Sequence, residues 1–365
     1  MDTNRLTERF MDYVRCDSES RDERRFCEKL EAELVALGLE VRRDDVSEST
    51  GSNGFNIHAR LNGTGKPLLF SCHMDTVFPG KGITPVIRDG VICSDGTTIL
   101  GSDDKSGIAA VMESLHRIVE GNLPHRTIEV MFTVSEEIGL LGSKNADYSG
   151  VQSKGAIVLD SSMVGCVINR APATARIHAK VTGKSAHAAI SPDHGAHALK
   201  AACEAIANIP CGYIGDNTVM NVGTLKCEGK TNVVPALAEF DMEVRSFIKE
   251  ELEAHISACE ETLKKACEHY GTSYVFDVDR QCDVLYVNEN SDTMLELLNA
   301  YRELGHEPTI SRTYGGSDAT WLFAHGIDAI NIGTGMEDVH GLSEHINIEN
   351  MVTTAELVFK LMCRQ

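Results

Sequence analysis

Apolar and polar positions follow two different patterns along this chain. Short, nearly continuous apolar runs occupy residues 67–72, 127–134 and 155–159. Between the first two, residues 106–119 carry apolar side chains at helical spacing, which predicts a helix. Apolar strands that alternate with helices are typical of a mostly parallel α/β sheet. Two amphipathic helices, at 1–18 and 22–37, are expected to precede this sheet.

The pattern changes between residues 173 and 284. The predicted elements there are a strand, a helix, two strands, a helix and a strand, at 174–181, 194–208, 218–225, 236–245, 249–270 and 273–278. This βαββαβ order fits a ferredoxin-like α+β domain. Beyond it the α/β pattern returns, with helices at 291–304, 319–324 and 349–362 and a strand at 328–332. We therefore expect one discontinuous α/β domain, 1–172 and 285–365, with residues 173–284 inserted in it.

Charge and composition narrow the classes of partner. The formal net charge is −20, and nucleic acids and anionic membranes repel such a surface, so neither is an expected partner. No apolar stretch approaches the roughly 18 residues of a membrane span. The N-terminus lacks the apolar core of a secretory signal, so we expect a cytoplasmic protein. Its twelve cysteines are expected to stay reduced, and no C-x-x-C pair suggests a thiolate metal site.

Acidic and imidazole side chains follow the predicted strands. His73 and Asp75 end the first apolar run, Glu136-Glu137 follow the second, and Asp160 ends the third. Asp103-Asp104 precede the predicted helix. Each has an ordinary explanation by itself, such as a helix cap or a solvated turn. Open α/β sheets bind ligands at the carboxyl ends of their strands, so their repetition there predicts one shared site.

The residue types at these positions suit a hydrolytic metal site. His73, Asp103, Glu137, Asp160 and His340 are nitrogen and oxygen donors. Two metal ions about 3.5–4 Å apart need a carboxylate that bridges them. Five ligands with one shared leave each ion three protein ligands and a position for water. Zinc suits this donor set best, and manganese or cobalt is also compatible with it.

Longer motifs around these residues resemble a known family. The motifs of the α/β part are His73-Met74-Asp75, Gly101 to Gly107, Ser135 to Gly139, Asp160 and His340 to Ile346. Those of the insertion are Gly183 to Ala188, Thr231 to Pro235 and Phe240 to Arg245. In order and approximate spacing they resemble the M20 metallopeptidases, and most of all the peptidase T type of tripeptide aminopeptidase. The resemblance covers nearly the whole chain. It implies a zinc-exopeptidase-like catalytic domain with an inserted lid or dimerisation domain.

The resemblance also implies a role for each matching residue. Asp103 would bridge two divalent metal ions, with His73 and Asp160 completing one site. Glu137 and His340 would complete the other. Glu136 would be the general base, and Asp75 would orient His73 from behind. The peptide bond between Asp103 and Asp104 is expected to be cis, as it often is in this family.

Three residues of the insertion resemble substrate-facing groups of that family. His187 looks like a histidine that reaches the active site of a partner in dimeric relatives and stabilises an oxyanion. Asn232 and Arg245 look like contacts to polar atoms or the carboxylate of a substrate. His187 as a plain loop residue and Arg245 in a surface ion pair are the alternatives. Residues 315–318 resemble a loop close to the substrate pocket, or form a simple Gly-rich turn.

The function expected from these observations is hydrolysis of short peptides by a two-metal exopeptidase. A homodimer through the inserted domain is a possible assembly. Deacylation of N-acyl amino acids on the same scaffold is the first alternative. A metal-binding protein without catalytic activity is the second, although no expected ligand or base position is missing. The chain lacks the G-x-S-x-G motif of a serine hydrolase elbow.

Overall fold

The computed structural model describes residues 2–364, and they form two compact units. The first unit comprises the chain up to Arg170 together with the chain from Tyr286 onward. The second unit is Ala171–Leu285. Within residues 2–364, no helix has both the length and the apolar character needed to cross a membrane.

One sheet of nine strands forms the centre of the first unit, as counted over the described residues. Its strands are β1 (Glu40–Asp44), β2 (Asn56–Leu61), β3 (Leu68–His73), β6 (Ile128–Thr133), β7 (Gly155–Ser161), β8 (Cys166–Ala171), β14 (Leu285–Tyr286), β15 (Thr309–Arg312) and β16 (Asp328–Gly333). Neighbours β6, β3, β7 and β16 are parallel, and β1 and β2 extend the sheet antiparallel at one edge. The predicted α/β class with a largely parallel sheet is confirmed.

Burial explains the unbroken apolar runs. Every residue of β3 and of β6 is buried, because both strands lie inside the sheet and have both faces covered. The acidic and imidazole residues of the predicted site lie at or beyond strand ends. His73 is the last residue of β3, and Glu136 follows β6 by three residues.

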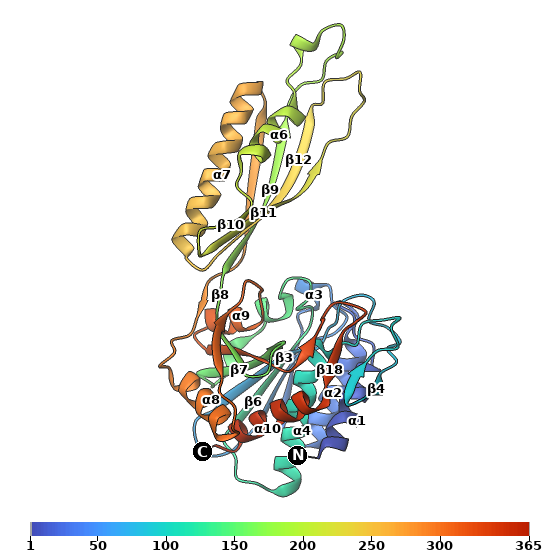
Figure 1. The fold of residues 1–365 in the computed structure, drawn as a ribbon, viewed down its shortest axis with the longest axis vertical. Coiled ribbons are helices and arrows are strands. Elements are labelled where there is room, and N and C mark those ends of the chain that lie inside the picture. Colours follow the sequence, from blue (N-terminus) through green and yellow to red (C-terminus); the bar gives the residue numbers. More distant parts are fainter. Residues whose placement is uncertain (1, 365) are drawn as a thin grey trace. The chain divides into compact units, whose positions relative to one another are not determined.

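Helices cover this sheet. They are α1 (Thr3–Val14), α2 (Arg24–Ala36), α3 (Ser47–Thr50), α4 (Ser102–Gly121), α5 (Leu141–Lys144), α8 (Asp292–Glu303), α9 (Ala319–Ala324) and α10 (Ile348–Met362), with a 3-10 turn η1 (Tyr148–Gly150). Figure 1 shows α4 beside α10, and α4 also contacts β3 and β7. The predicted apolar face of the first helix is confirmed, since Leu6, Phe10 and Tyr13 are fully buried.

A small second sheet of the first unit holds the two strands on either side of the loop that contains His340. It consists of β17 (Met336–Glu337), β18 (His345–Asn347), β5 (Val91–Cys93) and β4 (Val86–Arg88). Strands β17 and β18 pair antiparallel, so residues 338–344 form a short loop between them. The antiparallel pair β4 and β5 is the short hairpin expected after residue 85. Strands β17 and β18 were not predicted, because strands of two or three residues show too little periodicity.

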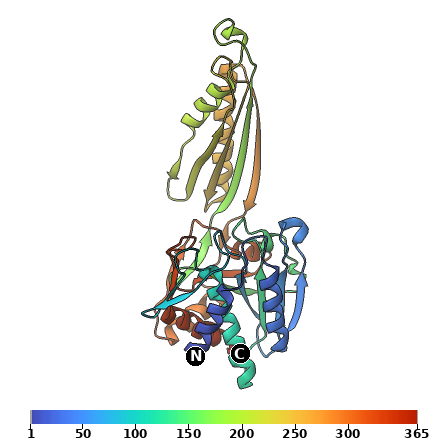
Figure 2. The same ribbon diagram turned by 90° about the vertical axis from the view of Figure 1, so that its right-hand side faces the viewer.

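The second unit contains an antiparallel sheet with helices on one face, as Figure 2 shows. In chain order its elements are β9 (Ala173–Thr182), η2 (Pro192–His194), α6 (Ala198–Asn208), β10 (Gly212–Ile214), β11 (Thr218–Lys226), β12 (Leu237–Ser246), α7 (Lys249–Tyr270) and β13 (Ser273–Cys282). Strand β9 pairs with both β12 and β13. Apart from the short β10, this is the expected βαββαβ order. Its core includes alanines of α6 and aromatic and aliphatic side chains of β12.

Candidate metal centre

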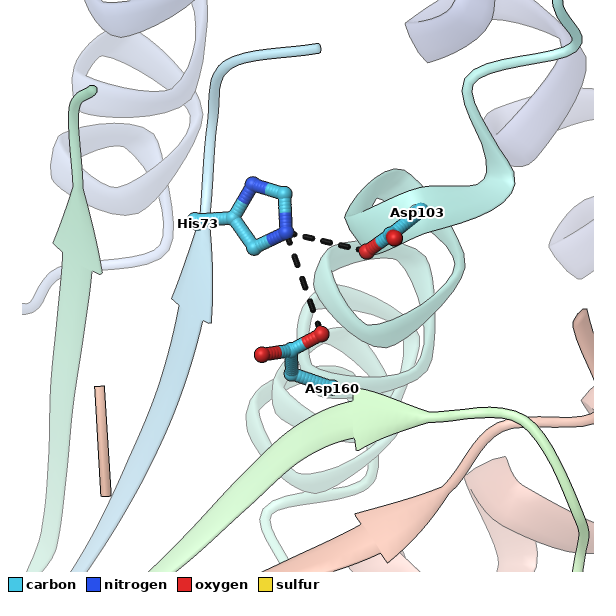
Figure 3. Close-up of side chains that lie close together, drawn as sticks. All are labelled: His73, Asp103 and Asp160. Carbon is cyan, nitrogen blue, oxygen red and sulfur yellow. Dashed lines mark hydrogen bonds and ion pairs between the residues drawn. The ribbon is translucent and has the colours of Figure 1, made fainter. Parts of the chain in front are cut away.

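Three different elements bring His73, Asp103 and Asp160 together at the carboxyl ends of the central strands. Figure 3 shows His73 at the end of β3, Asp103 in the first turn of α4 and Asp160 near the end of β7. The Nε2 atom of His73 lies 3.0 Å from Oδ1 of Asp103 and 3.9 Å from Oδ1 of Asp160. These ligand atoms are close enough to hold one metal ion together.

Asp103 also faces a second group of potential ligands. Its other oxygen, Oδ2, lies 3.3 Å from Nε2 of His340. The same nitrogen of His340 lies 3.0 Å from Oε1 of Glu137. Asp103, Glu137 and His340 therefore form a second potential ligand group that shares the carboxylate of Asp103 with the first. This is the arrangement that two neighbouring divalent ions require.

The start of α4 has an irregular backbone that presents Asp103. Gly101 has a left-handed φ of 73°, and the ψ of Asp103 is 107°, outside the helical range. The peptide bond between Asp103 and Asp104 is cis, as the family resemblance implied. With its non-helical φ and ψ Asp103 precedes the regular part of the helix, and its side chain faces His73 instead of capping the first turn.

Asp75 contacts His73 and also fixes the backbone that follows the neighbouring strand β6. Its carboxylate accepts hydrogen bonds from the backbone N–H groups of Glu136, at 2.9 Å, and Glu137, at 3.2 Å. The closest contact to Nδ1 of His73 is the backbone oxygen of Asp75, at 3.0 Å, whereas the carboxylate lies 3.5 Å away. Asp75 thus links the two strand ends that carry His73 and the pair of glutamates.

The backbone just before Glu136 is held by a buried carboxylate that was not predicted as a site residue. Ser135 has a positive φ of 56°, and its N–H and hydroxyl both donate to Glu23. Glu136 follows this turn and is 9% exposed. One of its carboxylate oxygens lies within metal-binding reach of His73 and Glu137. The side chain of Glu136 is therefore buried beside the potential ligands.

The centre is rich in carboxylates, and this shifts the pKa values of its groups. Burial, together with the negative charges of neighbouring carboxylates, raises the pKa of Glu136 and of Asp160. Hydrogen bonds to Asp103 and Glu137 raise the pKa of His340 to about 10. Burial opposes protonation of His73, but its hydrogen bonds to Asp103 and Asp75 outweigh this and raise its pKa. Carboxylates crowd together here, and bound cations would offset their mutual repulsion.

The donors of this centre fit two divalent cations. All five predicted ligands offer nitrogen or oxygen atoms, and the structure places their ligand atoms in two groups that share Asp103. The one cysteine of this strand end, Cys72, is buried, and burial raises the pKa of its thiol. A neutral thiol is a poor metal ligand. The residues present therefore match a borderline-hard ion such as zinc or manganese.

The remaining predicted residues belong to the second unit, so their relation to the metal centre stays a prediction. His187 is exposed, and its Nδ1 accepts hydrogen bonds from the N–H groups of Ala189 and Ile190. Asn232 is exposed on the adjacent loop, where His187 bridges to Val233. Arg245 donates to Glu243 at 2.6 Å, which is the ion pair considered as its alternative role.

Three further polar residues support the centre and were not predicted as site residues. Asn331 of β16 bonds both the backbone N–H and C=O of Asp160. Asp318 accepts from Thr133 and Ser143, which flank the two glutamates. Glu344 accepts from the loop before Asp103. A single asparagine inside the apolar run 328–332 was a recognisable signal. Asp318 lies in the predicted loop 315–318 and Glu344 in the motif from His340 to Ile346, but no pattern connects either residue with its partners more than 170 residues away.

Comparisons with known proteins give one consistent result. The model of peptidase family M20/M25/M40 matches residues 69–364. The uncharacterised protein YqjE of Bacillus subtilis is 35% identical and covers 98% of this chain and 97% of its own length. The structure of aminopeptidase PepT from Bacillus cereus is 36% identical, with a TM-score of 0.94 over 99% of this chain and 98% of its own. A tripeptidase from Staphylococcus aureus is 30% identical, with a TM-score of 0.96 over 100% and 98%.

Proposed function

The chain belongs to peptidase family M20/M25/M40, and we propose that this metallopeptidase removes N-terminal residues from short peptides, tripeptides foremost, at a centre of two divalent metal ions. The observation that carries the proposal is the carboxylate of Asp103, whose two oxygens face His73 and His340. Similarity to an aminopeptidase and a tripeptidase over almost the entire chain supports the choice of substrate.

The five ligands divide into one shared residue and two separate pairs. Asp103 would hold both ions, His73 and Asp160 would hold the first, and Glu137 and His340 would hold the second. When bound, such ions polarise a carbonyl and lower the pKa of a water molecule toward neutrality. Zinc is the preferred ion, and removal of metal by a chelator should abolish hydrolysis. Metal analysis after restoring zinc, manganese or cobalt would identify the ion that supports activity.

Glu136 acts as the general base in this proposal. Its carboxylate accepts a proton from the attacking water and delivers it to the leaving amine. Its burial supports this role, because a raised pKa brings a carboxylate closer to the pH at which it can both accept and return a proton.

Replacing Glu136 by Gln tests the base without changing the shape of the side chain. We expect kcat to fall by at least about a hundredfold, while both metal ions stay bound. Glu129→Gln, a buried carboxylate at the other end of β6, is the control and should keep its kcat. Full activity of the Glu136 variant would show that another group is the base.

The inserted domain is proposed to act as a lid and to form a homodimer. His187 lies beyond the end of β9 that pairs with Leu237, whereas Arg245 pairs with Thr174 at the other end. Eight residues of strand separate these ends by roughly 25 Å, but an extended tripeptide spans only about 10 Å. If both side chains contact one substrate, they must therefore come from different copies. His187 would then stabilise the oxyanion from the partner.

A substrate panel separates this proposal from its alternatives. We expect tripeptides with a free N-terminus to be hydrolysed faster than dipeptides or N-acyl amino acids. Cleavage of only the blocked substrates would identify a deacylase on the same scaffold and rule out the aminopeptidase. If the metal-loaded protein hydrolyses no member of the panel, it is a metal-binding protein without this activity.

A further inference from the structure

The loop that leads to Asp103 is wrapped around the carboxylate of a buried glutamate, Glu344. Glu344 is 1% exposed. Its Oε2 accepts from the backbone N–H groups of Leu100, at 2.9 Å, and Gly101, at 3.0 Å. Its Oε1 accepts from the N–H and the hydroxyl of Ser102, at 2.7 and 2.6 Å, and from the N–H of Asp103, at 3.3 Å. Four consecutive N–H groups thus point at one carboxylate.

Glu344 belongs to the same short loop as His340. This loop, residues 338–344, joins β17 to β18. It is folded on itself by hydrogen bonds from Gly341 to Asp338 and from Glu344 to Gly341. His340 and Asp338 have positive φ angles of 66° and 51°. A single carboxylate therefore connects the loop that carries His340 to the loop that carries Asp103.

The two histidines of the centre differ in how they are held. The side chain of His73 is 2% exposed, and its Nδ1 is fixed by the backbone oxygen of Asp75. The side chain of His340 is 50% exposed. Its Nε2 forms ion pairs with Asp103 and Glu137. The place of His340 beside Asp103 therefore depends on its loop, whereas His73 is fixed by its strand.

We propose that Glu344 is a positioning residue for the second metal position, the one formed by Asp103, Glu137 and His340. It sets the distance between the bridging carboxylate and His340, and through this distance the affinity for the second ion. The proposal rests on the two-metal centre proposed above. Its effect on the first position is small, since His73 and Asp160 are held by strands β3 and β7 and by Asn331.

The chemistry of Glu344 explains why a neutral side chain is a poor substitute. A carboxylate accepts on both oxygens, and bonds to a charged acceptor are roughly twice as strong as those between neutral groups. In Glu344→Gln, one oxygen becomes an NH₂ group that faces backbone N–H donors and cannot accept from them. The His340 loop must then move, because the side chain of His340 is 50% exposed, whereas Asp103 is buried and bonded to His73.

Metal binding to the metal-free protein tests the proposal without any peptide. We expect Glu344→Gln to weaken the second of two stepwise metal affinities by about 10–100-fold, and to leave the first unchanged. The visible spectrum of bound cobalt should change for the second equivalent only. Ser102→Ala, which removes one of the bonds to Glu344, should fold readily and weaken the same step by a smaller factor.

Glu129→Gln is the matched control for burial and bonding. Glu129 is 4% exposed and accepts from Arg60, the N–H of Gln152, and the N–H and hydroxyl of Ser153. This variant should lower the melting temperature and retain both metal affinities. Unchanged stepwise affinities in both Glu344→Gln and Ser102→Ala, or an equal loss in Glu129→Gln, would overturn the proposal. A wild-type protein that binds one ion only would instead refute the two-metal centre.

Discussion

At the scale of single residues, the shared carboxylate of Asp103 makes the two metal positions separable by mutation. His73 contacts one oxygen of Asp103 and His340 the other. We expect His73→Ala to lose the first ion, His340→Ala to lose the second, and Asp103→Ala to lose both. Metal content per chain, measured after gel filtration, checks this. Loss of both ions from each histidine variant would mean that the positions fill only together.

The histidines also make metal binding depend on pH. In the metal-free protein the pKa of His340 is raised to about 10, so at pH 7 the ring carries a proton that a metal ion must displace. Each rise in pH lowers the free energy of that displacement. Metal affinity should therefore increase between pH 6 and pH 8, by about tenfold per pH unit for each proton released. Calorimetry in buffers of different ionisation enthalpy counts these protons, and a flat profile would contradict the assignment.

At the scale of elements, the N-terminal part of α4 depends on close packing against β7. A Cβ atom at Gly107 would lie 2.3 Å from Oδ1 of Asp104 and 2.8 Å from Cβ of Leu159. Gly107→Ala should therefore push this part of the helix away from the sheet. We expect a loss of about 1–3 kcal/mol in unfolding free energy and weaker metal binding. Gly150→Ala is the control, because its Cβ would meet only a distant arginine atom at 3.9 Å, and both properties should persist.

The same scale shows which elements were predictable. Long helices such as 249–270 and buried strands such as 155–159 were recognised, because many residues share one period. Strands β15, β17 and β18 were missed, because two to four residues are too few to show a period of alternating apolar and polar positions. The motif of the His340 loop was recognisable from its residues. Its geometry was not, because the two strands that bound it are among these short ones.

At the scale of the whole molecule, a site completed by two copies has a testable signature. His187→Ala and Glu136→Gln should each be nearly inactive alone. In a homodimer whose His187 acts on the partner, one site of a mixed dimer combines intact His187 with intact Glu136. Mixing the variants one to one after dissociation should restore about a quarter of wild-type activity, since half of the dimers are mixed. Absence of any recovery in proven mixed dimers would place His187 in the site of its own copy.

The sequence alone determined the α/β class, the βαββαβ insertion and the types of the five potential ligands. The class and the insertion depend on local periodicity, and His73, Glu137 and Asp160 directly follow strands, so both signals are visible within a few positions. Asp103 and His340 belong to motifs that the family resemblance matches. Only the tertiary structure decided that Asp103 presents one oxygen to each histidine, and that Asp75, Asn331 and Glu344 hold the loops in place. Those contacts join segments up to 244 residues apart, and a buried carboxylate finds such partners only when the chain has folded around it.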